Sequence, residues 1–191
     1  MSVSLNKGDR VELSKDSRVN AVSVCLGWDT AKYDDEDFDL DASAFVIGRN
    51  GMTRRDEDFI FYNNLQHPSG GITHSGDNLT GGGDGDDEVI KVVLNKLPKY
   101  AEKVVFCVTI HEAERRMQDF GMVENSFIRV VDDNTGREIA RYDLKEKFGD
   151  STAIIAGEIY RDGSGWKFHA VGDGFNGGLF DLCEKFGIEV K

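Results

Sequence analysis

Strand-length runs of β-branched and aromatic residues, separated by turn-forming residues, are the feature that most constrains how this chain folds. Such residues suit a pleated, half-buried surface, and Gly, Asn, Asp and Pro between them favour tight turns. The runs lie at residues 11–13, 22–26, 38–47, 59–62, 89–94, 104–110, 127–131, 138–144, 153–161 and 166–171. Turn-rich segments at 132–136 and 162–165 join the last four runs into two hairpins. We therefore predict an all-β fold, mainly an antiparallel β-sandwich.

Two segments favour helix instead. Residues 112–120 have helical preferences and a charged exterior, which predicts a short surface helix. Near the end of the chain, apolar side chains recur at helical spacing before a glycine suited to a C-terminal cap: Leu179, Leu182, Cys183, Phe186 and then Gly187. With 191 residues and 39% apolar side chains, the chain can bury one substantial core. We predict a single domain over residues 1–191, with one or two short helices including a C-terminal one.

The stretch 76–88 combines five acidic side chains with five glycines and contains no Lys, Arg or His. Crowded carboxylates repel one another unless a cation lies between them, and glycines permit turns that point backbone carbonyls at such an ion. Alternation near its end predicts three carboxylates presented together, those of Asp84, Asp86 and Glu88. Hard oxygen ligands of this kind favour calcium.

A second acidic segment precedes it in the chain. In an extended strand, alternate residues share a face, so the pattern predicts one acidic face, formed by Asp37, Asp39 and Asp41, and one core face, formed by Phe38, Leu40 and Ala42. A solvated strand edge is the alternative, but Asp is depleted in strands and like charges on one face destabilise each other. The two segments together are predicted to bind one or two Ca²⁺ ions, each with about six to eight oxygen ligands.

The charge of the chain is concentrated in these two segments. Seven acids against one lysine give residues 29–41 a balance of −6, and five acids give residues 77–88 a balance of −5, out of a net charge of −12. No basic stripe is visible, so direct binding to nucleic acid is not expected. The rest of the surface is nearly neutral, which favours local acidic sites over general acidity.

The known metal and catalytic motifs fit poorly. The stretch 76–88 lacks the EF-hand spacing, and residues 82–89 match one β-roll calcium nonapeptide, a motif that needs tandem copies. The alternative function is a metal-dependent hydrolase or phosphotransfer enzyme that uses the same acids. The chain has no phosphate-binding G-x-x-x-x-G-K-[ST] loop and no G-x-S-x-G elbow, and His74 is interpreted as a hydrogen-bonding or exposed residue. A non-enzymatic binding module is therefore favoured.

The cysteines and the amino terminus indicate the compartment. Cys25, Cys107 and Cys183 are far apart and have apolar neighbours, which predicts buried free thiols rather than disulfides. No apolar leader segment and no run of membrane-spanning length is present. We expect a cytoplasmic protein that is not inserted in a membrane.

Several longer motifs resemble the TerD family of bacterial tellurium-resistance and stress proteins. They are the motifs at residues 27–29, 37–43, 59–64, 74–81 and 85–88, and the likeness continues through 127–129, 140–144, 157–161 and 166–168. Two positions depart from the family pattern, because an acidic residue is common where Gly82 stands and Gln where Asp173 stands.

The resemblance implies a β-sandwich that binds calcium through its acidic loops, acts in resistance to tellurite and other stresses, and has no established catalytic activity. It implies that family paralogues and a membrane protein of the same gene cluster are partners, so the protein is expected in the cytoplasm, peripheral to the inner membrane through them. The full predicted ligand set is Asp29, Asp37, Asp39, Asp41, Asn64, Asp77, Asn78, Asp84, Asp86 and Glu88.

Overall fold

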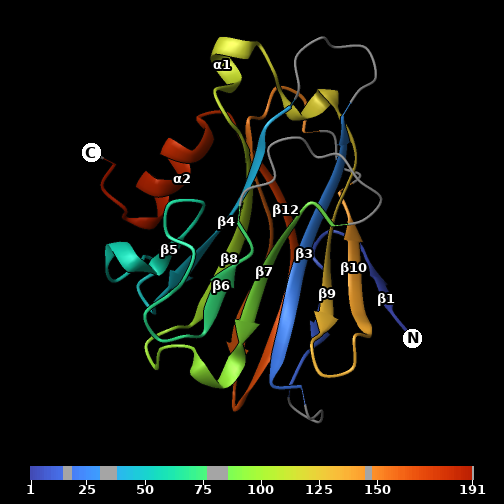
Figure 1. The fold of residues 1–191 in the computed structure, drawn as a ribbon, viewed down its shortest axis with the longest axis vertical. Helices are drawn as coiled ribbons and strands as arrows, with labels where there is room; N and C mark the ends of the chain where they lie inside the picture. The colour runs from blue at the N-terminus through green and yellow to red at the C-terminus, as the bar shows by residue number, and fades with distance from the viewer. Residues whose placement is uncertain (15–18, 31–37, 77–85, 145–147, 191) are drawn as a thin grey trace.

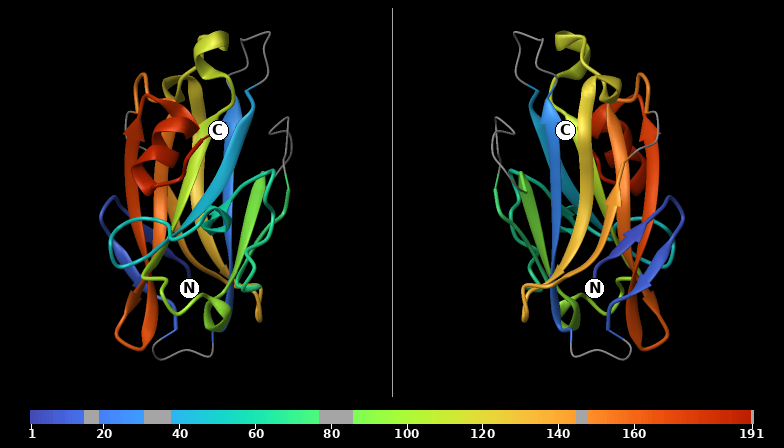
Figure 2. Two further views of the ribbon diagram at one scale, coloured as in Figure 1. Left: turned by 90° about the vertical axis from the view of Figure 1, so that its left-hand side faces the viewer. Right: turned by 90° about the vertical axis from the view of Figure 1, so that its right-hand side faces the viewer.

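The computed structural model describes residues 1–14, 19–30, 38–76, 86–144 and 148–190. These residues form two six-stranded sheets stacked as a sandwich, which confirms the predicted all-β fold (Figure 1). Figure 2 shows the two layers from their sides, with the hairpin of β11 and β12 at the lower end. The prediction of a single domain over residues 1–191 stays a prediction.

The first sheet, sheet A, has the strand order β1-β10-β9-β3-β7-β6. The pairs are antiparallel except for β1 with β10, which is parallel. In chain order its strands are β1 (Val3–Leu5), β3 (Ala21–Thr30), β6 (Ile72–His74), β7 (Glu88–Val93), β9 (Val123–Asp132) and β10 (Glu138–Asp143).

The second sheet, sheet B, has the order β2-β12-β11-β8-β4-β5, with antiparallel pairs throughout its described residues. In chain order its strands are β2 (Arg10–Glu12), β4 (Leu40–Ile47), β5 (Phe59–Ile60), β8 (Lys103–Ile110), β11 (Ala153–Asp162) and β12 (Gly165–Phe175). Both predicted hairpins are present, as β9–β10 and β11–β12.

The apolar side chains form two layers of core. The main core lies between the sheets and includes Val24, Phe106 and Ile128. A second cluster lies on the outer face of sheet B, where helix α2 (Gly178–Phe186) packs Leu182 and its apolar neighbours against the strands. Gly187 adopts the left-handed conformation, with φ 82°, and ends this helix as the sequence predicts.

The predicted helix at 112–120 is much shorter than expected. Only α1 (Ala113–Arg116) is α-helical, and a 3₁₀ turn, Phe120–Met122, follows it. Met117, with φ 53°, ends the helix in the left-handed region, and its N–H bonds to the Glu114 carbonyl. Further 3₁₀ turns occupy Asp56–Asp58 and Leu94–Lys96.

Two strands are absent from the sequence prediction. Strand β6 lies between the predicted runs at 59–62 and 89–94, and β1 lies before the first predicted run. Each has only three residues, too few to show a clear alternation of apolar side chains. Among the described helices, none is long and apolar enough to cross a membrane.

The cysteines are buried free thiols, as predicted. Burial raises the pKa of Cys25 to about 12 and that of Cys183 to about 11, and it also raises the pKa of Cys107. These thiols are therefore protonated at neutral pH, and none is poised as a nucleophile.

A buried polar network anchors the segment between β5 and β6. The Asp58 carboxylate is fully buried and accepts hydrogen bonds from the Tyr100 hydroxyl at 2.6 Å and the Arg54 amide at 2.8 Å. It also lies 3.0 Å from His67 Nε2, while His67 Nδ1 accepts the backbone N–H of Ser69. Burial alone would raise the Asp58 pKa, but the hydrogen bonds from His67, Tyr100 and Arg54 outweigh it and hold the pKa below its usual 3.8.

This shift predicts a defined dependence of stability on pH. Because the folded pKa lies below the unfolded one, the Asp58 contribution is present above about pH 4 and is lost as the pH falls through the folded pKa. We expect Asp58→Asn to lower the free energy of unfolding at neutral pH by about 2 kcal/mol and to flatten its decline below about pH 4. Urea denaturation across pH, with the exposed neighbour Asp56→Asn as control, measures both effects. Parallel curves for Asp58→Asn and wild type would refute the lowered pKa.

Candidate metal centre

The described strand ends that flank the two acidic segments lie in the upper half of the view in Figure 1. Strand β3 ends at Thr30 and β4 begins at Leu40, so these two strands flank most of the acidic residues 29–41. Strand β6 ends at His74 and β7 begins at Glu88, so these two strands flank the acidic stretch 76–88 up to its last residue. The described ends of the two segments are therefore neighbours, although they are distant in sequence.

Backbone hydrogen bonds join these ends directly. The Trp28 N–H donates to Asp87 Oδ2 at 2.8 Å, and the Asp87 N–H donates to the Leu26 carbonyl at 2.8 Å. Burial raises the Asp87 pKa, the Trp28 hydrogen bond opposes this, and the negative charges of Asp29 and Asp86 add to it. The negative charges of Asp29, Asp86 and Asp87 thus lie close together, and a bound cation would reduce their repulsion.

The side chain of Glu88 links the two sheets. Its carboxylate is buried, and Oε2 accepts the Ala42 N–H at 2.6 Å and lies 3.3 Å from His74 Nε2. Among the described residues, β5 pairs with β4 only at Ala44 and Phe45, so it does not reach Ala42. The side chains of Glu88 and His74, both from sheet A, therefore bond to the backbone of β4 at Ala42, where β5 does not pair with it.

His74 completes this link. Its Nε2 lies 2.9 Å from the Ala42 carbonyl, and its Nδ1 accepts the Gly76 N–H at 2.9 Å, so the ring carries its hydrogen on Nε2. Burial alone would lower the His74 pKa, but the contacts with Glu88 and the Ala42 carbonyl, and the charge of Asp41, raise it above 6.5. The interpretation of His74 as a hydrogen-bonding residue is confirmed.

Asp86 is neutralised by an arginine that is distant in sequence. Arg129 binds it through two hydrogen bonds, Nε to Oδ1 at 2.8 Å and Nη2 to Oδ2 at 2.7 Å, and its Nη1 donates to Glu138 at 3.1 Å. The hydrogen bond with Asp86 raises the Arg129 pKa further. The stretch 76–88 contains no basic residue, but the fold brings Arg129 from β9 against it. Asp86 is partly exposed beside Arg129 while Glu88 is buried, so these two acids are not presented together, and Asp84 lies outside the described residues.

The acidic face expected at 37–41 is only partly as predicted. The strand begins at Leu40, and the alternation holds, because Asp41 lies on the opposite face from Leu40 and Ala42. That face is not solvated, because all eight residues of β4 are buried and α2 covers the same face at Phe45. Asp39 precedes the strand, and its carbonyl accepts the His111 N–H at 2.8 Å.

Two further predicted ligands make hydrogen bonds within the protein. The Asp29 carboxylate lies at the exposed end of β3 and accepts a hydrogen bond from Asn125 Nδ2 at 2.7 Å. The Asn64 side chain donates to the Phe59 carbonyl at 2.7 Å and closes the turn after β5. Asp29 therefore lies at the described end of β3, next to the acidic residues, whereas the Asn64 side chain stabilises the turn after β5.

The remaining predicted ligands, Asp37, Asp77, Asn78 and Asp84, lie outside the described residues. Within the described part of the chain, no group of three His, Cys, Asp or Glu side chains is placed to hold a metal ion. Calcium ligation by this set stays a prediction. Sequence reasoning missed Arg129 and Asp87 as partners here, although the motif at 127–129 contains the arginine.

Comparison with known proteins identifies the family. The family model described as TerD domain matches residues 1–186. The chain belongs to the TerD family. It is 52% identical over 192 residues to the tellurium resistance protein TerD of Serratia marcescens, and 50% identical over 192 residues to general stress protein 16U of Bacillus subtilis, with full coverage of both chains in each case.

A solved structure agrees with this assignment. A homologue of the telluride resistance protein TerD from Streptomyces coelicolor superposes with a TM-score of 0.70 at 26% identity, covering 86% of this chain and 95% of that one. Serratia marcescens also has relatives named TerX and TerZ, at 39% and 40% identity. The TerD family therefore includes paralogues within one organism.

The link between the sheets of this TerD-family fold can be tested by removing Glu88. Glu88→Ala leaves the Ala42 N–H and His74 Nε2 buried without their carboxylate, and we expect it to cost about 3 kcal/mol of folding free energy. Glu184→Ala, an exposed glutamate on α2, should cost less than about 0.5 kcal/mol. Chemical denaturation of both variants gives the comparison. Equal stability of the two variants would show that Glu88 does not hold the sheets together.

Proposed function

We propose that this TerD-family chain is a non-enzymatic calcium-binding protein of the tellurite-resistance and stress-response system. Its acidic loops coordinate one or two Ca²⁺ ions and order a surface that binds partners. The observation that carries the proposal is the junction of the two acidic segments, whose described ends meet through the contacts of Asp87 and Glu88. The similarity to a tellurium resistance protein and to a general stress protein supports the role in resistance and stress.

The described residues differ in how well they suit calcium. Asp86 is already bound by Arg129, and Glu88 by the Ala42 amide, so an ion would have to displace these partners. Asp29, Asp39 and Asp41 supply hard carboxylate oxygens close to the described ends of β3 and β4. We propose these three as candidate ligands, together with the acids outside the described residues.

The chemistry of the thiols supports a binding role over reaction with tellurium compounds. A thiol must ionise to attack or bind a soft element, and burial raises the pKa of Cys25 to about 12. Protection would then depend on calcium and on partners, rather than on these side chains. The proposed partners are TerD-family paralogues and a membrane protein of the same gene cluster, in the cytoplasm at the inner membrane.

Calcium titration of metal-free protein tests the proposal. We expect saturable heat with Ca²⁺ and little competition from Mg²⁺, which demands a rigid octahedron and keeps its waters. Asp39→Asn should weaken calcium binding by about tenfold or more, because it removes one charged ligand. Asp162→Asn, in the hairpin at the opposite end of the sandwich, is the matched control and should bind as wild type does (Figure 2).

Activity separates the proposal from the enzyme alternative. Loss of calcium binding in Asp39→Asn should accompany loss of tellurite protection, with no turnover of phosphoesters or glycosides by the wild-type protein. An absence of heat with Ca²⁺, beside clear heat with Zn²⁺ or Mn²⁺, would show that the ion is misassigned. Reproducible turnover that Asp39→Asn abolishes would favour the metal-dependent hydrolase or phosphotransfer enzyme.

A further inference from the structure

A pocket of about 440 Å³, which we call the loop pocket, lies where the loop after β4 meets the loop before β8. The first loop contributes residues 48–50 and 52–54, and the second contributes residues 99, 100 and 102. The Glu102 N–H donates to the Ile47 carbonyl at 2.8 Å, so the two loops are held together. None of the predicted calcium ligands lines this pocket.

Cationic side chains dominate the lining of the loop pocket. Arg49, Arg54 and Lys99 stand against a single acid, Glu102, and these four residues leave a local balance of +2 in a chain whose net charge is −12. Within the described residues, none of the three cations forms an ion pair with a carboxylate. Their charge is therefore available to an anionic ligand.

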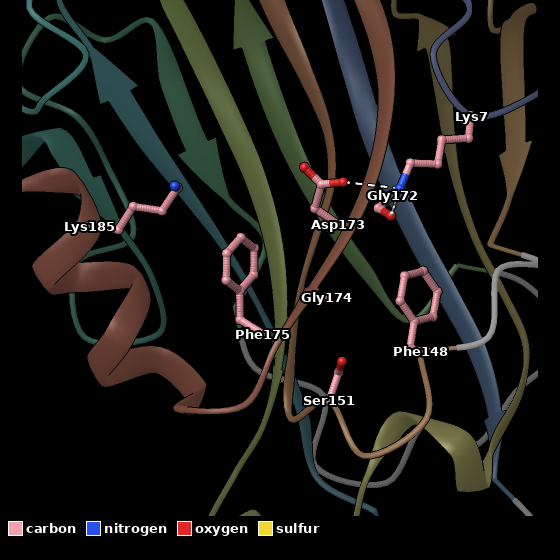
Figure 3. A pocket seen from close by; sticks show the side chains of 8 residues that line it. All are labelled: Lys7, Phe148, Ser151, Gly172, Asp173, Gly174, Phe175 and Lys185. Atoms are coloured by element: carbon pink, nitrogen blue, oxygen red, sulfur yellow. Dashed lines mark hydrogen bonds and ion pairs between the residues drawn. The ribbon is translucent and has the colours of Figure 1, made fainter.

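The pocket drawn in Figure 3, at the end of β12, suits an anion less well. Its Lys7 ammonium donates to the Gly172 carbonyl at 2.9 Å and to Asp173 at 3.1 Å, as the dashed lines show. That positive charge is already balanced within the protein. The second lysine, Lys185, lies over the Phe175 ring and apart from Lys7, so the two ammonium groups do not meet on one ligand.

The buried Asp58 carboxylate fixes the central part of the loop pocket. It accepts hydrogen bonds from the Tyr100 hydroxyl at 2.6 Å and from the Arg54 backbone N–H at 2.8 Å. The Arg54 guanidinium lies over the Tyr100 ring, with Cζ 5.0 Å from the ring centroid. A guanidinium stacked on a ring keeps the N–H groups of its edge for other partners, and its planar fork matches two oxygens of a phosphate. Arg54 is thus positioned for an oxyanion without being neutralised.

The place of the loop pocket in the fold explains how so acidic a chain can bind an anion there. Strand β4 runs from Leu40, beside the acidic residues 29–41, to Ile47, beside the pocket. Its ends are roughly 23 Å apart at the rise of an extended strand. Charges are largely screened beyond about 8 Å at physiological ionic strength. The nearer acids Asp56 and Glu57 are exposed and do not line the pocket.

We propose that the loop pocket binds a phosphate dianion, free or as the end group of a small phosphate monoester. The Arg54 guanidinium holds two of its oxygens, and Arg49 and Lys99 supply the remaining positive charge. A dianion matches the local balance of +2, whereas a carboxylate monoanion leaves one cation without a counter-charge. The volume is enough for a phosphate group and a small molecule attached to it. This site shares no residue with the proposed calcium centre, so either can fail without the other.

Nuclear magnetic resonance titration of the full chain tests this, in buffer without added calcium and at constant ionic strength. The probes are inorganic phosphate and glycerol 3-phosphate. We expect saturable shifts of the backbone amides of Arg49, Arg54 and Lys99, with weaker effects from acetate. Tighter binding of glycerol 3-phosphate than of phosphate would assign the site to a monoester, and the reverse order would assign it to the free ion.

Two matched variants test the arginine fork. Arg54→Lys keeps the charge but loses the fork, and it should weaken phosphate binding by about three- to tenfold. Arg137→Lys, at an exposed arginine in the β9–β10 hairpin, should bind as wild type does. Acetate binding as tightly as phosphate would overturn the assignment of a dianion. Shifts that sodium chloride reproduces, or that Arg54→Lys leaves unaltered, would overturn the proposal altogether.

Discussion

The buried carboxylate of Glu88 is the interaction on which the acidic end of this protein depends. It belongs to sheet A, yet it accepts the N–H of Ala42 in sheet B at 2.6 Å, and His74 binds the carbonyl of the same residue. A buried carboxylate is stable only when its charge is matched by donors. The same contacts therefore satisfy the hydrogen-bonding groups of Glu88, of His74 and of the β4 backbone at Ala42. They also hold the starts of β4 and β7 together.

This junction changes how the local excess of negative charge is understood. Part of it is neutralised within the protein, because Arg129 binds Asp86, and the buried Glu88 carboxylate accepts hydrogen bonds from the Ala42 amide and from His74. Burial and the negative charges of Asp29 and Asp86 raise the pKa of Asp87, although the Trp28 amide donates to it. The proposed role of calcium is to balance the charge that remains, rather than to hold together every acid in the two segments.

Much of the fold follows from local patterns, while the site depends on contacts across the chain. The β-branched runs predicted ten strands and both hairpins, and the spacing of Leu182, Cys183 and Phe186 predicted α2 with its glycine cap. Periodicity could not show that α2 covers the face bearing Asp41, because that depends on tertiary packing. Nor could it pair Asp86 with Arg129, 43 residues away, since no local rule links such distant positions.

Amide hydrogen exchange with and without calcium tests the central claim most directly. The informative amides are those of Trp28 and Ala42, which donate to Asp87 and Glu88, and the amide of Val105 in the core of sheet B is the reference. If calcium stabilises the junction of the two acidic segments, exchange at Trp28 and Ala42 slows when Ca²⁺ is added and exchange at Val105 changes less. Equal exchange at Trp28 and Ala42 in both states, under conditions where calcium is bound, would contradict the account.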